Sequence, residues 1–439
     1  QINHPLGSKE RAEFKEGAAG IPFSESIVPE GMNLFNGWLP YRNTFYWDKK
    51  QMLEGAGDYS KATIYHWQHG SAGTEEDGFT APLLESIKKP LENRVWYNYQ
   101  GQISGGFANL GMSGKPSIIG QVLSDGTTQL KKFFYNSRDK DSLVIDASGR
   151  STSYKYDSTG IDLLEVRQTT NGINELLAKN TYDPQHPHLI KTSTDASGQQ
   201  TSYTYNTAGQ IAIITNARKE KTTFTYDAKG YLKTITGAVP GATANFTYDG
   251  FGRVRTVTDA EGYAITTDYD VLDRPTVITY PNGTFKQIVY DRLDAVAMKD
   301  RLGRWTHYLY DSLRRLNAVT DPLGKITQYI WCTCGNLSEI VDPLKHITTF
   351  NYDLQSRLIS KIYDDGKAIS YKYDTTSRMT EMTDAKGQTT KYSYYIDDNI
   401  KQVDYTSAII ATPSVFYSYD DRYNRLDTMI DGTGITAYA

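Results

Sequence analysis

The chain is 439 residues long, 38% of the residues are hydrophobic and 22% are charged, and the formal net charge is −4. Lys and Arg together number 47 against 51 Asp and Glu, without a long run of like charge. This balance disfavours nucleic acid and anionic membranes as partners. No segment reaches the roughly 18 consecutive apolar residues that a membrane helix needs, so no membrane insertion is expected in this segment.

The composition favours strands and tight turns over helices, because the chain contains 34 Tyr and 36 Gly while alanine-leucine-rich stretches are scarce. The two cysteines, Cys332 and Cys334, are separated by one residue, which we interpret as too close for an easy disulfide. The sequence therefore predicts a β-rich fold held by burial and hydrogen bonding, without cross-links.

The chain divides into three expected parts. Residues 1–62 form a β-rich or irregular lead-in with aromatic residues between Gly and Pro. Residues 63–130 contain degenerate two-strand units with insertions, in which Thr63-x-Tyr65-x-Trp67 and Val95-x-Tyr97-x-Tyr99 keep the alternation of a strand. Residues 131–439 are regular repeats.

The regular part is marked by a recurring Tyr followed by Asp or Asn, which we call the anchor. From Tyr135 to Tyr419 there are 13 intervals of about 21.8 residues each, with Trp331 and Tyr394 filling two gaps. Such a regular interval indicates a true repeat. The remaining anchors are Tyr156, Tyr182, Tyr205, Tyr226, Tyr248, Tyr269, Tyr290, Tyr310, Tyr352 and Tyr373.

Each repeat has an internal pattern that predicts two strands and two turns. An aromatic residue two positions before the anchor, as at Tyr308 and Tyr310, indicates a half-buried strand. After the anchor, Asp begins a turn that often ends in Gly and Arg, which predicts a hairpin. The second strand runs to a corner such as Asp321-x-x-Gly324, which leads into the next aromatic strand. Two departures, residues 171–188 and 405–413, are expected to be a local insertion and a protruding loop.

The phrase Thr-x-Tyr-x-Tyr-Asp-x-x-Gly-Arg-Leu…Thr-Asp-x-x-Gly resembles the YD repeat of the RHS proteins, bacterial relatives of the extracellular teneurin repeats. Good copies are residues 222–257 and 306–321. The resemblance implies an all-β YD-repeat β-spiral, a curled antiparallel sheet around a hollow. About 30 strands at about 4.8 Å spacing give a sheet about 145 Å long, so we expect an open partial shell of about one turn.

The sequence ends at a strand pattern in which Thr436 and Tyr438 occupy the first positions of a further repeat. We therefore expect the parent protein to continue into the RHS-associated core and C-terminal cargo that the resemblance implies. The expected partners are this remainder of the chain or another subunit at the sheet edge, with glycans or a cell-surface receptor as further possibilities.

Residues that could carry chemistry have simpler structural interpretations. Cys332 and Cys334 offer too few ligands for a metal and are interpreted as a tolerated substitution at a turn. The pairs His66-x-x-His69 and His186-x-His188 are expected to be solvated loop histidines.

The acidic residues are also given structural roles. The run Glu75, Glu76 and Asp77 is interpreted as a solvated loop, and the Asp corners as turn chemistry instead of calcium sites, which need six to eight oxygens. The recurrent Arg after the turn is expected to pair with a turn Asp. No nucleophile, metalloprotease, phosphate-loop or dinucleotide motif occurs, so we predict no catalytic, cofactor-binding or metal residue and no cofactor.

Three functional classes are compatible with these observations. The first is a structural shell of a secreted or cell-surface protein, which encapsulates or displays a C-terminal toxin or effector. The second is an adhesion or glycan-binding module that uses aromatic strands and the loops near residues 170–190 and 400–415. The third is a carbohydrate-active enzyme, whose two carboxylates could come only from the segments outside the repeat. The first is favoured, because a repeat array supplies surface readily and unique chemistry poorly.

Overall fold

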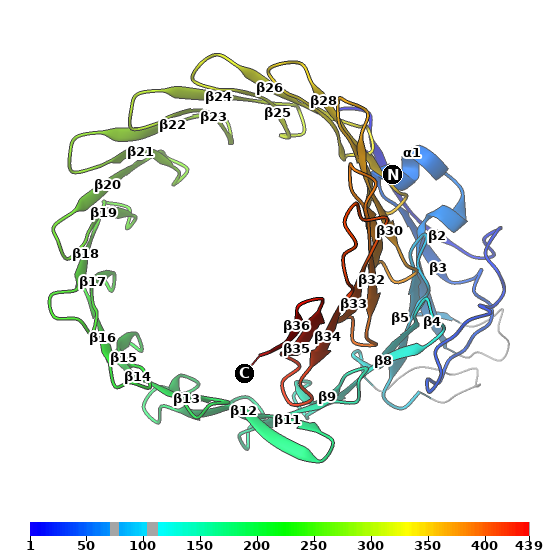
Figure 1. Cartoon of the computed structure of the whole chain (residues 1–439). Coiled ribbons are helices and arrows are strands. Elements are labelled where there is room, and N and C mark those ends of the chain that lie inside the picture. Colours follow the sequence, from blue (N-terminus) through cyan, green and yellow to red (C-terminus); the bar gives the residue numbers. More distant parts are fainter. Residues whose placement is uncertain (71–78, 103–112, 439) are drawn as a thin grey trace. The chain divides into compact units, whose positions relative to one another are not determined.

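The computed structural model describes residues 1–70, 79–102 and 113–438. It has one short α-helix, α1 (Lys49–Gly55), one 3₁₀ turn, η1 (Tyr59–Lys61), and 36 strands in one open sheet (Figure 1). Each strand whose register is defined pairs antiparallel with the strand next to it in the chain, as β24 does with β23 and β25. The all-β prediction is confirmed.

The strands before the regular repeats are β1 (Ile2–Asn3), β2 (Lys9–Lys15), β3 (Asn43–Trp47), β4 (Thr63–Gly70), β5 (Phe79–Lys88), β6 (Val95–Tyr99) and β7 (Pro116–Val122). The repeats begin with β8 (Thr128–Tyr135), β9 (Asp141–Ile145), β10 (Ser151–Tyr156), β11 (Leu163–Thr170), β12 (Ile173–Tyr182), β13 (Ile190–Asp195), β14 (Gln200–Tyr205), β15 (Ile211–Thr215), β16 (Lys221–Tyr226), β17 (Leu232–Thr236), β18 (Thr243–Tyr248), β19 (Val254–Thr258), β20 (Ala264–Tyr269) and β21 (Pro275–Thr279).

They continue as β22 (Phe285–Asp291), β23 (Asp294–Lys299), β24 (Trp305–Tyr310), β25 (Leu316–Thr320), β26 (Ile326–Trp331), β27 (Leu337–Val341), β28 (Ile347–Tyr352), β29 (Leu358–Ile362), β30 (Ala368–Tyr373), β31 (Met379–Thr383), β32 (Thr389–Tyr394), β33 (Ile400–Thr406), β34 (Val415–Tyr419), β35 (Leu426–Asp431) and β36 (Gly434–Ala437). The regular repeats thus contain two strands each, as predicted.

The chain forms two compact units. Unit 1 consists of Gln1–Ser153, Gln168–Ile173 and Tyr329–Ala439, and unit 2 consists of Tyr154–Arg167 and Asn174–Gln328. Unit 1 therefore combines early and late parts of the chain, whereas unit 2 contains the repeats between them.

The well-buried core lies in the lead-in of unit 1. Phe45, Trp47 and Trp96 are fully buried and pack with Leu39 and Ile64. The helix α1 joins this region through a capping box, in which the Asp48 side chain accepts a hydrogen bond from the Gln51 backbone N–H. The repeats differ, because most of their strand residues are half-buried instead of fully buried. Their stability must therefore come largely from hydrogen bonding and repeated local contacts.

The two turns of each repeat lie at opposite ends of the strands. We call the end formed by turns after the anchors, such as residues 311–315, the anchor rim. The end formed by corners before the aromatic strands, such as residues 321–325, is the corner rim. In both kinds of turn the Asp carboxylate accepts from backbone N–H groups, and Asp321 does so from Leu323 and Lys325 at 2.9 Å each. The predicted turn chemistry is confirmed.

The anchor tyrosine has a role that the sequence pattern did not predict. Its hydroxyl donates a hydrogen bond to a backbone carbonyl of the preceding repeat, as in Tyr269 to Val254 at 2.8 Å and Tyr226 to Ile211 at 2.8 Å. A register shift in the strand pairing occurs immediately before each of these tyrosines. The anchor therefore fastens one hairpin to the next.

The recurrent arginine pairs with the Asp of its own turn, as expected, and also covers the next anchor ring. Arg274 lies 2.6 Å from the Asp270 carboxylate, and its guanidinium carbon is 4.0 Å from the Tyr290 ring centre. The same arrangement joins Arg253 to Tyr269. At these anchors the group that stacks on the ring is a guanidinium, because the arginine of the preceding turn occupies that position.

Candidate functional site

The structure brings together two parts of the chain that are far apart in sequence. Within unit 1, anchor-rim turns of the late repeats contact corner-rim turns of the early strands at four successive positions. We call this contact the seam. The late turns are residues 353–357, 374–378, 395–399 and 420–425, and the early segments are residues 89–94, 123–129, 146–150 and 168–171.

The first two positions join the late turns to the segment between β5 and β6. The Gln355 side chain donates to the Pro90 carbonyl. At the next turn, the Asn93 backbone N–H donates to the Thr375 carbonyl at 2.7 Å, and its side-chain amide donates to the Thr375 hydroxyl at 3.0 Å. The seam thus includes a backbone hydrogen bond between residues 282 positions apart.

The third position is centred on Gln129 and Arg150. The Gln129 side-chain amide donates to the Ile396 carbonyl at 2.7 Å and to the Asp398 carboxylate at 3.0 Å. The Arg150 guanidinium donates to the Asp397 carboxylate at 2.6 Å and to Asp146 of its own turn at 2.6 Å. Both partners of the Arg150 and Asp397 pair are about nine-tenths buried. A charged pair in this position fixes the alignment of the two rims.

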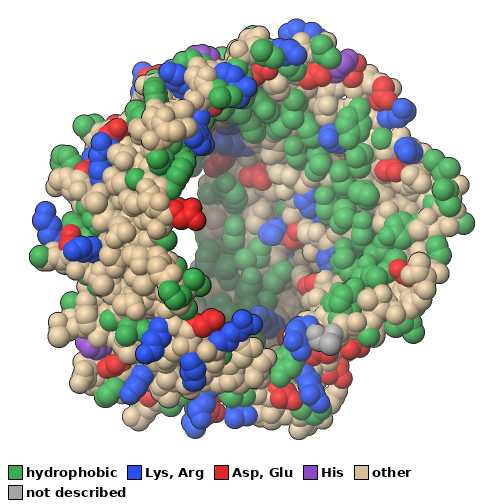
Figure 2. All heavy atoms as spheres, turned by 60° about the vertical axis from the view of Figure 1, so that its left-hand side comes forward, with side chains coloured by type: hydrophobic (Ala, Val, Ile, Leu, Met, Phe, Trp, Pro, Cys, Tyr) green, Lys and Arg blue, Asp and Glu red, His purple; other side chains and the backbone are tan. Residues whose placement is uncertain are grey.

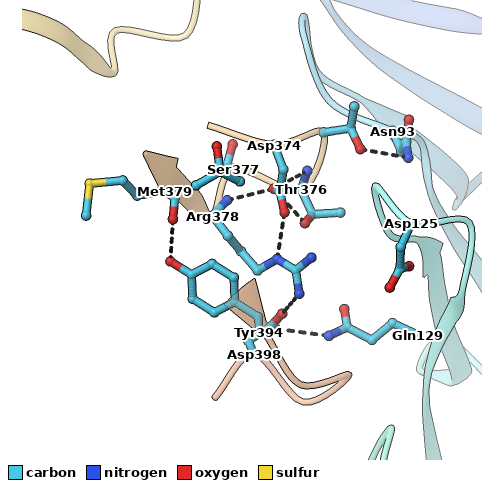
Figure 3. Close-up of polar contacts among 12 residues, drawn as sticks. Asn93, Asp125, Gln129, Asp374, Thr376, Ser377, Arg378, Met379, Tyr394 and Asp398 are labelled. Carbon is cyan, nitrogen blue, oxygen red and sulfur yellow. Dashed lines mark hydrogen bonds and ion pairs between the residues drawn. The ribbon is translucent and has the colours of Figure 1, made fainter. Parts of the chain in front are cut away.

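Figure 3 shows how the second and third positions are connected. Arg378 donates to Asp374 of its own turn at 2.8 Å and to Asp398 of the next turn at 3.1 Å. Asp398 in turn accepts from Gln129, and the Arg378 guanidinium lies over the Tyr394 ring. One arginine therefore links the repeat contacts to the seam.

Electrostatics at the seam favour the charged forms. Burial alone would raise the pKa of Asp374, but hydrogen bonds from Arg378 and from backbone N–H groups outweigh it, and the pKa is lowered. Burial would likewise lower the pKa of Arg150, but hydrogen bonds to Asp146 and Asp397 raise it. Asp374 and Arg150 therefore remain ionised at neutral pH.

The fourth position uses the turn between β11 and β12. The Asn171 side chain donates to the Asp421 carboxylate at 3.1 Å, and the Gln168 side chain donates to the Arg422 carbonyl. Residue 171 begins the segment that we interpreted as a local insertion. The structure gives it a role in the seam.

Two cavities accompany the seam. The first, of about 410 Å³, is bordered by Val95, Leu130, Arg150 and Asp397 among others. The second, of about 240 Å³, lies beside Asn171 and Tyr395. Arg150 and Asp397, which border both cavities, are paired with each other, so the arrangement is suited to holding two rims together.

The histidine prediction was wrong for one pair. His66 and His69 lie in β4 and are buried, with 0% and 2% exposure. The His66 ring contacts Asn43 at 2.9 Å and Glu85 at 3.3 Å, because β3 and β5 flank β4 and cover it. Burial lowers the pKa of both histidines. Among the residues that the structure describes, no group of three or more His, Cys, Asp or Glu side chains is arranged to hold a metal.

The other histidine pair lies in the loop after Tyr182. His188 is exposed and contacts Asp162 at 2.8 Å, whereas His186 is only partly exposed and lies beside the Tyr205 ring. The acidic run of residues 75–77 lies outside the described residues.

The cysteine prediction was also wrong. Cys332 and Cys334 form a disulfide, with Cα atoms 5.0 Å apart, which is within the usual range. The tight turn explains this, since Gly335 N–H donates to the Cys332 carbonyl at 3.0 Å and reverses the chain. In other turns the carboxylate of the first residue, Asp, accepts a hydrogen bond from the backbone N–H two residues later. The disulfide joins the same two positions.

Sequence reasoning did not find the seam. Gln129 and Asn93 are ordinary surface residue types that no repeat position marks, and Arg150 follows its corner as Arg304 does, without a sign of its distant partner. Their partners become visible only when segments more than 240 residues apart are brought together. The only available signal was the recurrence of Asp and Arg in the turns, which predicted the turns and not their contacts.

Comparison with known families agrees with the repeat pattern. Residues 174–302 match the teneurin YD-shell family, and residues 357–389 match the RHS repeat. No curated protein sequence matches the chain. Residues 174–302 thus resemble the teneurin YD shell, and residues 357–389 resemble the RHS repeat.

One solved structure has a similar fold with a TM-score above 0.5. The crystal structure of TcdB2-TccC3-TEV aligns with a TM-score of 0.52 at 12% identity, covering 89% of this chain and 25% of that chain. The Photorhabdus luminescens Tc holotoxin pore aligns with a TM-score of 0.48 at 13% identity, covering 89% of this chain and 24% of that one. The chain therefore spans about a quarter of the length of these solved chains.

Proposed function

We propose that this chain is a wall segment of an RHS/YD-repeat shell whose work is structural and which encloses or displays a polypeptide encoded with it. The observation that carries the proposal is the seam. Its four successive contacts fasten late repeats to early strands, and the chain between them begins and ends at that contact. A sheet whose late repeats are fastened to its early strands can enclose a volume.

The distribution of chemistry supports a structural role. The charged groups at the seam are engaged with each other, and the Asp and Arg of the repeats serve turns and anchor rings. A catalytic group need occur only once, whereas these recur in successive repeats. We therefore propose that the chain has no catalytic activity of its own.

The proposed partners are the remainder of an RHS shell and a C-terminal toxin or effector. The solved chain with a similar fold is part of TcdB2-TccC3, and the alignment covers 25% of that chain. The proposed location is extracellular. No described helix is both long and apolar enough to cross a membrane. The matched families give no support to the adhesion alternative.

Enclosure can be tested with a flexible, protease-sensitive peptide attached after Ala439. A matched protein carries the same peptide before Gln1, and cleavage of both is followed at equal protease concentrations. We expect at least tenfold slower cleavage of the C-terminal peptide if the shell encloses the polypeptide attached at its C-terminus. Equal cleavage of the two peptides would contradict enclosure.

A variant with a weakened seam provides the second comparison. In Gln129→Ala combined with Arg150→Ala, the Gln129 and Arg150 contacts to the turn at residues 395–399 are lost. Cleavage of the C-terminal peptide should accelerate while the circular dichroism spectrum stays β-rich. Protection that is unchanged by these substitutions would show that the seam does not secure the enclosure.

A further inference from the structure

The seam shows that an anchor rim can bind a corner rim. Two of its contact residues, Gln355 and Asp397, occupy the third position of their turns. The same position in unit 2 can therefore be examined for a surface of the same kind.

In unit 2 the third position of three successive anchor-rim turns is apolar and exposed. Phe251, Leu272 and Leu293 are 84%, 54% and 56% exposed, and each follows the preceding one by 21 residues. Val271, beside Leu272, is 97% exposed. These residues form an apolar row along the anchor rim, which we call the anchor row.

The corner rim of unit 2 carries a matching row. Leu302 and Leu323 occupy the third position of successive corners, are 77% and 80% exposed, and are also 21 residues apart. The following corner, in unit 1, has Leu344 at the same position. We call Leu302 and Leu323 the corner row.

The turns hold both rows in the same way. The backbone N–H of Leu272 donates to the Asp270 carboxylate at 2.8 Å, and that of Leu323 donates to Asp321 at 2.9 Å. Because one repeat contributes two strands, neighbouring residues of either row are about 10 Å apart along the sheet. Two rows with the same spacing can meet residue by residue.

Charged side chains that form ion pairs within their own turns lie beside both rows. Arg274 pairs with Asp270 beside the anchor row, and Arg304 pairs with Asp300 beside the corner row. Figure 2, which turns the repeats of unit 2 forward, shows hydrophobic side chains lying between charged ones. An apolar centre with a paired polar border is typical of a protein interface. Burying these rows would therefore leave both of these ion pairs intact.

We propose that the anchor row of one chain binds the corner row of a second copy of this chain. The seam supports this partner, because there the same two kinds of rim already bind each other at successive positions. Anchor and corner rims lie at opposite ends of the same strands, so every copy presents both. Such a head-to-tail contact leaves one anchor row and one corner row free at the ends of the assembly, so further copies can be added in series.

The proposal is tested by sedimentation velocity of the full chain from about 1 μM to about 100 μM, a range that covers weak interfaces. The anchor variant combines Phe251→Lys and Leu272→Lys, and the corner variant combines Leu302→Lys and Leu323→Lys. Wild type should gain mass with concentration, and each variant should associate at least tenfold more weakly. Glu261→Lys, at the third position of another corner in unit 2, is the control and should behave as wild type.

Mixing the two variants distinguishes the mode of contact. The anchor variant keeps its corner row and the corner variant keeps its anchor row, so the mixture should form a one-to-one complex and stop there. Circular dichroism of each variant checks that it is folded. A monomeric wild type at every concentration, or an anchor variant that associates as wild type does, would overturn the proposal. The second outcome would indicate contact through like rows or through the strand edge at β36.

Discussion

Arg150 and Asp397 are 247 positions apart in the sequence, yet the guanidinium of one lies 2.6 Å from the carboxylate of the other. Both side chains are about nine-tenths buried. Most other contacts between the two sides of the seam are hydrogen bonds of amide groups. We therefore expect this charged pair to contribute more to the stability of the seam than any of them.

We expect Arg150→Gln to lower the free energy of unfolding of unit 1 by about 2 kcal/mol, the usual value of a hydrogen bond between charged groups. Hydrogen exchange should also accelerate at the turn of residues 395–399, because its partner across the seam is lost. The control is Arg304→Gln, since Arg304 pairs within an exposed turn. It should change stability by less than about 0.5 kcal/mol. Equal effects of the two substitutions would contradict a special role for the seam.

The hydrogen bond of the anchor hydroxyl should make a measurable contribution to stability. Tyr269→Phe removes only the hydrogen bond to the Val254 carbonyl and keeps the ring under Arg253. We expect unit 2 to lose about 1 kcal/mol in urea unfolding. Tyr263→Phe is the matched control, because Tyr263 lies at a corner and is 42% exposed. A loss at Tyr263 as large as that at Tyr269 would show that the hydroxyl does not fasten the hairpins.

Much of the fold could be predicted because its determinants are local. Alternation in a strand such as residues 305–310 and the Asp turn after it lie within about a dozen residues. The pattern therefore predicts hairpins and their repetition. It could not predict the bond from Tyr269 to Val254, because that depends on how two hairpins are aligned.

The seam and the buried histidines depend on distant neighbours. His66 is covered by Asn43 and Glu85, which belong to other strands, and its own spacing from His69 says nothing of them. The pairing of Arg150 with Asp397 likewise could not be predicted from the sequence near either residue. A residue's environment was predictable where one repeat creates it, and unpredictable where separate segments meet.

The histidines buried in β4 should make unit 1 sensitive to acid. The charged groups that act on His66 are Glu85, Arg42 and Arg94, and burial is the largest cause that lowers its pKa from the usual 6.5. A group with a lowered folded pKa binds its proton more tightly in the unfolded chain. Stability should therefore be highest above about pH 7 and decline as the pH falls below 6.5.

The measurement is the melting temperature of the whole protein between pH 7.5 and about pH 5, with His66→Gln and the exposed control His188→Gln. His66→Gln should flatten the decline, although it should also lower stability at neutral pH. His188→Gln should leave the slope as in wild type. His346, whose pKa is raised by its hydrogen bond with Asp342, acts in the opposite direction. An identical slope for all three proteins would contradict the assignment to His66.

The disulfide between Cys332 and Cys334 replaces a turn hydrogen bond, and this equivalence can be tested directly. In other repeats the first turn residue is Asp, as at Asp342, which accepts from the Leu344 backbone N–H at 2.8 Å. Replacing Cys332 by Asp and Cys334 by Ala should therefore keep the free energy of unfolding within about 0.5 kcal/mol of the oxidised wild type, whereas Ala at both positions should lose about 1 kcal/mol. Adding reductant should lower the free energy of unfolding of the wild type only, since the variants have no cysteine. If the variant with Asp were no more stable than the one with two Ala residues, the disulfide would have a role beyond the turn.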